Sequence, residues 1–204
     1  MSETYFDKDA LAKWFKDNGD NTHRVNYLLN KESLVFDVGG YAGEWAEKIY
    51  SKYECKIFIF EPVSYCFNQI DNKFKNNEKI KVFNFGLSNR SYETNIHVDN
   101  ASSSLYSESE KTEKIKLIDI NDFITENNID KIDLLKINIE GAEFDLLDHM
   151  INSGSHVLVS DIQVQFHKMF EDAEIRRDSI RKNLSQTHKL TYDYKFVWEN
   201  WKKI

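Results

Sequence analysis

The sequence predicts an α/β fold: a mostly parallel twisted sheet with helices on both faces and an antiparallel hairpin at its C-terminal end. Two features of the chain lead to this prediction. Apolar, β-branched segments alternate with segments of helical periodicity between residues 33 and 153, and parallel strands need such helical crossovers. Residues 190–201 then read LTYDYKFVWENW, which is typical of two paired antiparallel strands.

The expected elements follow in chain order. Residues 7–20 repeat apolar side chains at helical spacing, so they are predicted to form an N-terminal helix, and a short second helix is expected over 23–30. The alternating core begins after them. Strands are expected at 33–38, 56–62, 79–86, 132–141 and 156–167, with helices after the glycines at 39–43, over 66–74, from about residue 143, and over 171–188.

Residues 88–116 interrupt this alternation. Strand-like pieces flank the polar run NASSSLYSESEKTE at 100–113. We therefore interpret 88–116 as an insertion, and its polar run either as an acceptor-binding lid or as a solvated surface run. A chain of 204 residues with one proline fits a single domain, 1–204, in which residues 1–30 form an N-terminal helical cap.

Composition and charge exclude several classes of function. The net charge of −7 comes from 34 acidic and 27 basic residues spread along the chain, so we expect no nucleic-acid partner. No apolar run approaches the length of a membrane span and the first residues lack a signal-peptide core, so we expect a cytoplasmic protein without a membrane partner. Cys55 and Cys66 stand outside any metal-binding spacing, so no metal site is predicted.

A glycine-rich turn follows the first core strand. The stretch VFDVGGYAGEW places Asp37, then Gly39, Gly40 and Gly43, between a strand and a helix N-terminus, where a ligand can lie against bare backbone. Glu61 ends the next strand, at the position of a carboxylate that binds ribose hydroxyls. NAD and S-adenosylmethionine both carry such a ribose. The dinucleotide fingerprint matches only in part, and the cationic groups of S-adenosylmethionine favour nearby acids such as Asp37.

Six segments resemble, in order, those of the FkbM-like methyltransferases: FDVGGYAGEW, IFEP, GLSN, SSSLY, IDLLKINIEGAEFDLL and VWENW. The resemblance runs from about Leu34 to the C-terminus, and its most specific segment is LLKINIEGAE. It implies the Rossmann-like fold of class I methyltransferases, with S-adenosyl-L-methionine as the cofactor. It also implies O-methylation of a sugar, glycan or nucleotide-sugar hydroxyl, or less often of a natural product. Lys-, Asn- and Ile-rich, Pro-poor usage indicates a bacterium, which favours a surface glycan or nucleotide-sugar.

The resemblance also assigns Tyr41, Gly86 and Asn138 to the cofactor site. The family more often has Ala and Asn where this chain has Gly40 and Tyr41, and it usually has Asp in place of Asn138. Tyr41 is therefore expected to alter how the methionine tail is held. Asn138 keeps a hydrogen-bonding group but lacks the charge that a metal ligand or a charge-based role would need.

Two neighbouring central strands carry polar side chains where buried parallel strands are normally apolar. By alternation, one face of each strand carries a polar set: Lys136, Asn138 and Glu140 on the first, and Asp161, Gln163, Gln165 and His167 on the second. Crevices at the carboxyl ends of such strands bind ligands.

Methyl transfer to an alcohol needs a base within reach of the hydroxyl proton. His167 and Glu140 are both candidates for this base, with Lys136 orienting Glu140 or lowering the pKa of the acceptor hydroxyl. The structural alternatives are a buried ion pair between Lys136 and Glu140 and a satisfied histidine at a strand end.

Two other functions fit part of the sequence. A reductase-type Tyr-x-x-x-Lys motif occurs at Tyr27 and Lys31, so an NAD-dependent oxidoreductase is one alternative, although the motif precedes the glycine turn and could not reach the nicotinamide. The residues at Tyr41 and Asn138 also fit a nucleotide- or glycan-binding domain of the same fold without catalytic activity.

Overall fold

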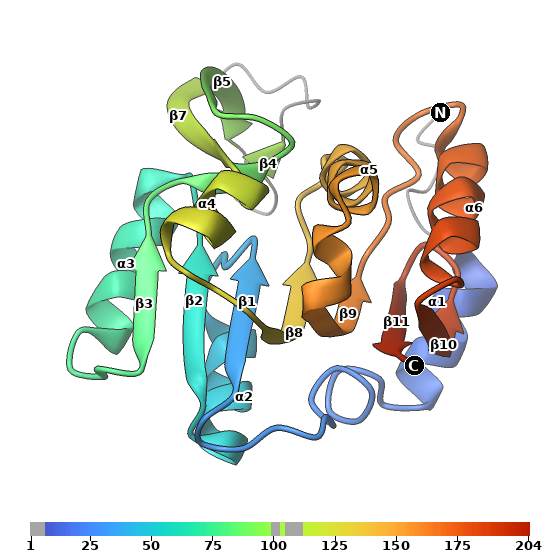
Figure 1. Cartoon of the computed structure of the whole chain (residues 1–204), viewed down its shortest axis with the longest axis horizontal. Coiled ribbons are helices and arrows are strands. Elements are labelled where there is room, and N and C mark those ends of the chain that lie inside the picture. The colour runs from blue at the N-terminus through green and yellow to red at the C-terminus, as the bar shows by residue number, and fades with distance from the viewer. Residues whose placement is uncertain (1–6, 99–102, 105–111) are drawn as a thin grey trace.

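The computed structural model describes residues 7–98, 103–104 and 112–204, and its main sheet has seven strands in the order β10-β11-β9-β8-β1-β2-β3. Their bounds are Leu34–Val38 (β1), Lys56–Phe60 (β2), Ile80–Phe83 (β3), Ile132–Ile137 (β8), Val159–Val164 (β9), His188–Tyr194 (β10) and Trp198–Lys203 (β11). The strands from β9 to β3 pair in parallel, and β11 runs antiparallel to both β9 and β10. This arrangement confirms the predicted fold class, including the C-terminal hairpin (Figure 1).

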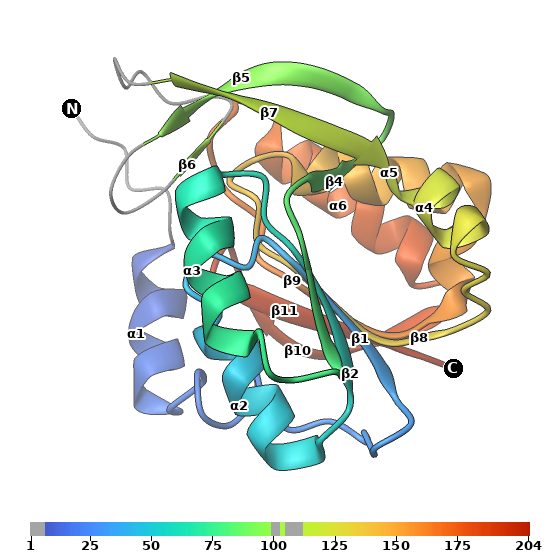
Figure 2. The same ribbon diagram turned by 90° about the vertical axis from the view of Figure 1, so that its left-hand side faces the viewer.

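Helices cover both faces of this sheet. One face carries α1 (Lys8–Lys16), α2 (Glu44–Tyr53) and α3 (Ser64–Phe74), and the other carries α4 (Ile120–Glu126), α5 (Glu143–Ser153) and α6 (Ala173–Leu184), with the 3-10 turn η1 (Ser155–Leu158) after α5 (Figure 2). Each face buries its own apolar cluster. The first includes Trp45 and Ile49 of α2, and the second includes Phe144 and Leu147 of α5. Burial on both faces explains why the central strands read as apolar runs.

A small second sheet lies beyond the carboxyl ends of β1 and β2 (Figure 1). Its strands are β4 (Gly86–Ser88), β5 (Tyr92–Val98), β6 (Ser103–Ser104) and β7 (Thr112–Asp119), in the order β4-β7-β5-β6. Ile96, Ile115 and Leu117 of this sheet pack against Val63 at the start of α3. The expected insertion, 88–116, contains most of this sheet. The part of its polar run at 100–102 and 105–111, where a lid was expected, lies outside the described residues.

The helix expected over 23–30 is wrong, and these residues form turns followed by an irregular segment. Their backbone groups bond to side chains of other elements instead of to one another. The carbonyl of Arg24 accepts from Trp45 Nε1 (3.0 Å), that of Val25 accepts from the Tyr53 hydroxyl (2.9 Å), and the Tyr27 N–H donates to the same hydroxyl (2.8 Å). Tertiary contacts therefore satisfy these groups without a helix.

Helix α4 was not predicted. Residues 114–120, KIKLIDI, read together as one strand-like segment rich in Ile and Leu, so the strand pattern hid the helix start. The signal that was present is Asp119, whose side chain caps the helix by accepting from the Asn121 N–H (2.8 Å).

The described helices are short. The longest, α6, has 12 residues, and in the part of the chain that the structure describes no helix combines the length and apolar character needed to cross a membrane.

Candidate functional site

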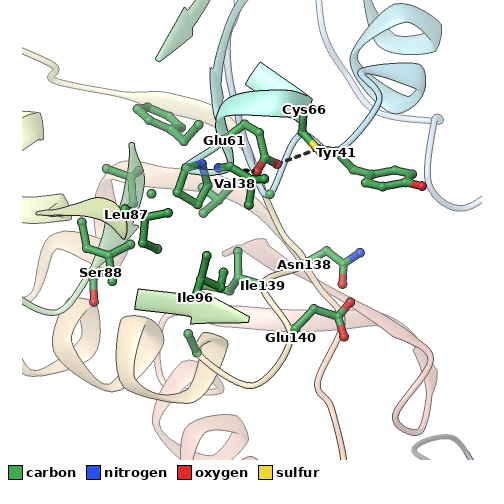
Figure 3. Close-up of a pocket in the computed structure, with 18 residues that line it drawn as sticks. Val38, Tyr41, Glu61, Cys66, Leu87, Ser88, Ile96, Asn138, Ile139 and Glu140 are labelled. Atoms are coloured by element: carbon green, nitrogen blue, oxygen red, sulfur yellow. Dashed lines mark hydrogen bonds between the residues drawn. The ribbon is translucent and has the colours of Figure 1, made fainter. Parts of the chain in front are cut away.

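A cavity of about 190 Å³ opens at the carboxyl ends of the parallel strands, beneath the small sheet. Apolar side chains form one wall, including Leu87 and Ile96 of the small sheet and Ile139, which follows β8 (Figure 3). Six residues singled out from the sequence line it: Gly39, Tyr41, Glu61, Gly86, Asn138 and Glu140. Asp37, Gly40, Gly43, Lys136 and His167 do not line it, so any contact they make with a ligand there remains a prediction.

The glycine turn brings β1 close to β8. Gly39 has a φ of 87°, and a Cβ at this position would lie 2.0 Å from the carbonyl oxygen of Asn138. Gly43, with a φ of 71°, begins α2. Only glycine fits both the close approach and the left-handed backbone at Gly39. The turn therefore presents backbone, without side chains, between the ends of two central strands.

Glu61 is held at the end of β2 by the glycine turn. Its carboxylate accepts hydrogen bonds from the N–H groups of Tyr41 (2.9 Å) and Val63 (3.0 Å), and the side chain is 6 % exposed. Burial raises the pKa of Glu61 to about 7, against the opposing effect of the two N–H donors. A carboxylate fixed in this way at the cavity is suited to accept hydrogen bonds from a ribose diol.

Lys136 lies under the glycine turn. Its ammonium donates to Asp37 Oδ1 (2.7 Å) and to the carbonyl of Gly39 (2.6 Å), and both charged side chains are almost completely buried. Burial lowers the pKa of Lys136, and the carboxylate of Asp37 opposes this effect. The expected pairing of Lys136 with Glu140 is wrong, because β8 ends at Ile137 and the chain turns before Glu140. The contacts of Lys136 with Asp37 and with the Gly39 carbonyl therefore fix the position of the glycine turn.

His167 lies between two carboxylates. Its backbone N–H and its Nδ1 approach Glu143 Oε1 at 2.8 Å and 3.1 Å, and its Nε2 lies 3.4 Å from Glu140 Oε1. Burial alone would lower the pKa of His167, but the hydrogen bonds and charges of Glu140 and Glu143 outweigh it and raise the pKa to about 10. The ring is therefore an imidazolium at neutral pH, and both of its N–H groups face carboxylates.

Glu143 is the residue of this group that sequence reasoning missed. It is wholly buried at the start of α5, where it also accepts a hydrogen bond from the Gly141 N–H (2.9 Å). An acid among the apolar residues on the inner face of a predicted helix was the signal that could have identified it. Glu143 thus joins the turn after β8 to the segment after β9.

Glu140 and Asn138 lie side by side at the edge of the cavity (Figure 3). Glu140 has a left-handed backbone, with a φ of 51°, and its side chain is 29 % exposed. The buried Oδ1 of Asn138 has no hydrogen-bond partner among the described residues. In that same part of the chain, no group of three His, Cys, Asp or Glu side chains is placed to hold a metal ion. The cavity thus combines an apolar wall with two polar side chains, those of Asn138 and Glu140, at one edge.

Comparisons with known proteins bear on this cavity. The family model described as methyltransferase FkbM domain matches residues 37–194. A comparison with curated proteins finds no match. The structure is similar to that of a Clostridium thermocellum protein described as an rRNA methylase, with 9 % identity, 93 % of this chain and 97 % of that chain covered, and a TM-score of 0.53.

Two further solved structures are similar to this chain. The 23S rRNA methyltransferase ErmE has 10 % identity, covers 92 % of this chain and 68 % of its own, and gives a TM-score of 0.50. TrmK from M. capricolum, solved with S-adenosylhomocysteine, has 11 % identity. The match covers 93 % of this chain and 68 % of TrmK, with a TM-score of 0.51. At these identities the likeness shows the fold alone, which is that of class I methyltransferases.

The expectation that nucleic acid is excluded as a partner is wrong. It rested on net charge, yet solved structures of the same fold include rRNA methyltransferases. Net charge sums the whole chain, whereas an acceptor meets only the groups near one edge of the sheet. The fold therefore leaves the class of acceptor open.

Proposed function

The chain belongs to the FkbM methyltransferase family, and on this premise we propose that it methylates a hydroxyl group of a sugar, glycan or nucleotide-sugar. The methyltransferase activity and the cofactor, S-adenosyl-L-methionine, follow from the family and the fold. The oxygen acceptor and its chemical class are the proposed part. The observation that supports an oxygen acceptor is the carboxylate of Glu140 at the cavity, backed by the buried His167 and Glu143.

The residues at the cavity fit the cofactor. Glu61 would hold the ribose, the backbone from Gly39 to Tyr41 would lie against the methionine portion, and the buried Oδ1 of Asn138 would accept a hydrogen bond from the α-ammonium group. When bound, the cofactor supplies a methyl group on a positively charged sulfur, so the leaving group is already activated. The chain has to align the acceptor and remove its proton.

Glu140 is the better candidate for the general base. It lines the cavity, whereas His167 is 3 % exposed and directs both ring nitrogens at carboxylates. An imidazolium has no lone pair with which to accept a proton. We therefore assign the proton transfer to a carboxylate oxygen of Glu140, and to His167 the task of holding that carboxylate in place through the contact between Nε2 and Oε1.

The acceptor class rests on the resemblance to enzymes that methylate sugars. Ile96 and Ile115 bring the region 88–116 into the cavity wall, which supports its proposed role in acceptor binding within a single domain. The alternative of an NAD-dependent oxidoreductase loses its catalytic motif, because the Tyr27 hydroxyl contacts Gln163 and Tyr192 instead of the glycine turn. A catalytically inactive domain remains the alternative to be tested.

A methyl-transfer screen tests the proposal. The full chain is incubated with methyl-labelled S-adenosylmethionine and, separately, nucleotide-sugars, glycan fragments, small natural-product alcohols and rRNA. Label is expected in an acid- and base-stable ether on a sugar, and Glu140→Gln should slow its formation strongly while S-adenosylhomocysteine still binds. Labelling of rRNA alone would overturn the acceptor class, and cofactor binding without any transfer would favour the inactive domain.

A further inference from the structure

A second cavity lies away from the glycine turn. It is bounded by the segment between α1 and β1, by the end of α2 and by strands β9, β10 and β11, and its volume is about 700 Å³. The segment between α1 and β1 passes below β8 and β9 in the view of Figure 1, at the end of the sheet opposite the small sheet. None of the described residues that line the first cavity lines this one.

Asn200 lines this second cavity and carries a buried side-chain oxygen that lacks a hydrogen-bond partner among the described residues. Its Nδ2 donates to Asp161 Oδ1 (3.0 Å) and to Thr191 Oγ1 (2.9 Å), which fixes the amide orientation because an oxygen could not face the Asp161 carboxylate. Asn200 is 2 % exposed, and its Oδ1 has no partner among the described residues. A buried acceptor in this state requires a donor that the described chain does not supply.

Gln163, next to the cavity, repeats the pattern. Its Nε2 donates to the carbonyl of Arg24 (3.3 Å) and to the hydroxyls of Tyr192 (3.2 Å) and Tyr27, and these two tyrosines line the cavity. Gln163 is fully buried, and within the described ranges its Oε1 also has no partner. Gln163 does not line the cavity itself, but it orders the two tyrosine hydroxyls that do, beside the amide of Asn200.

The charges at this cavity favour a neutral ligand. Lys202 and Asp161 are paired in the register of β11 and β9, so their charges offset each other. The ammonium of Lys52 already donates to the carbonyl of Val25 (3.3 Å) and to Asn26 Oδ1. An anion would meet the unpaired amide oxygens, and a cation would meet the two lysines. A hydroxyl group can donate to the oxygens and accept from the ammonium groups.

We infer that the second cavity binds a neutral sugar ring, with hydroxyl groups bonded to Asp161 and Asn200 and a C–H face against Tyr27 or Tyr192. A cavity of about 700 Å³ is far larger than the roughly 30 Å³ share of one water, so a single water does not fill it. The inference goes beyond methyl transfer, since this cavity lies apart from the glycine turn. It gives the chain a second point of attachment for a glycan.

Nuclear magnetic resonance titration of the full chain tests this inference. The probes are methyl glucoside, methyl mannoside, methyl galactoside and N-acetylglucosamine, with choline and inorganic phosphate as charged comparisons. At least one sugar should shift the amide signals of Thr191, Tyr192 and Asn200 in a saturable way. Asn200→Leu should weaken this binding about tenfold or more, and the same substitution at the exposed Asn72 should leave it unchanged.

Asn200 is buried, so each variant is first checked by thermal melting and by binding of S-adenosylhomocysteine. If Asn200→Leu does not fold, Lys202→Met, at a half-buried lining residue, takes its place and should weaken sugar binding several-fold. No saturable shift with any of the sugars would overturn the inference, as would shifts with choline or phosphate only. Because the readout is binding and not methyl transfer, failure here is distinct from failure of the proposed acceptor.

Discussion

Replacing Glu61 with glutamine should weaken cofactor binding and remove a pH-dependent loss of stability that the wild type shows. The carboxylate is buried at the cavity with two backbone N–H donors, and burial raises its pKa from 4.5 to about 7. Above neutral pH, the cofactor-free protein therefore holds Glu61 as a buried carboxylate, and this lowers its unfolding free energy. The same carboxylate is the group that would bind the cofactor ribose.

The size of this cost follows from the raised pKa. An acid of this kind binds more protons in the folded state than in the unfolded chain between pH 4.5 and 7, so stability falls as the pH rises through that window. At about 1.4 kcal/mol per pKa unit, the wild type should lose roughly 3 kcal/mol of unfolding free energy across it. Glutamine does not titrate, so the variant should not share this loss.

Denaturant unfolding near pH 5 and pH 8 measures the effect on the cofactor-free protein, where Glu61 has its raised pKa. The readout is the difference in unfolding free energy between the two pH values. The absolute values are not compared, because the glutamine side chain replaces only part of the hydrogen bonding of the carboxylate and lowers stability at both pH values. Calorimetry with S-adenosylhomocysteine at the higher pH should show binding weaker by roughly 1.5–3 kcal/mol, the scale of a hydrogen bond to a charged group. Wild-type affinity should rise with pH through about 7.

The matched control is Glu78→Gln, which removes an exposed carboxylate elsewhere on the surface. This control should keep both the wild-type pH dependence and the wild-type affinity. If Glu61→Gln and Glu78→Gln behave alike, or if Glu61→Gln binds S-adenosylhomocysteine as tightly as the wild type, the assignment of the ribose to Glu61 is wrong.

Three further predictions concern the charged side chains around the cavity. Glu140→Gln should lower the methyl-transfer rate about 100- to 10,000-fold with little change in S-adenosylhomocysteine affinity, and wild-type rates would refute its role as base. The wild type should lose stability as the pH rises from 6.5 to about 10, because the raised pKa of His167 makes its contribution to the unfolding free energy full below this window and absent above it. His167→Gln should remove this loss, and the same pH dependence of denaturation in the two proteins would contradict the prediction. Lys136→Met should cost about 3–5 kcal/mol by leaving Asp37 charged and buried, and the double variant with Asp37→Leu should recover much of it in a thermal melt.

The fold was predictable because its signals are local and repeated. Strands buried on both faces read as apolar runs, and helices with one buried face show helical spacing, so each element of the main sheet could be located. The failures are the segment 23–30 and α4. In the first, tertiary hydrogen bonds to Trp45 and Tyr53 override a weak helical pattern, and in the second a strand-like segment runs into a short capped helix.

The site was predictable only where a residue follows directly from the end of a strand. Gly39 and Glu61 lie at the cavity because parallel strands end at the same edge. The partner of Lys136 could not be read in this way. Asp37 and Lys136 are 99 residues apart and meet because the register of β1 and β8 places them opposite each other, and a sequence does not state a register.

The buried charges and the strained backbone at this edge belong to one arrangement. Tyr41 and Glu140 are non-glycine residues with left-handed φ values of 49° and 51°, and both line the cavity. Such conformations cost on the order of 1–3 kcal/mol each and persist only where the surroundings impose them. Two buried ion-pair groups lie beside these residues. Lys136 holds the glycine turn through Asp37 and the Gly39 carbonyl, and His167 holds the turn after β8 through Glu140 and Glu143.

Buried ion pairs are weak sources of net stability, but removing one partner is costly, so they are well suited to fix two loops in one position. The cavity is therefore shaped before any ligand enters, which lowers the ordering cost of binding and leaves more of the binding energy for aligning acceptor and methyl group.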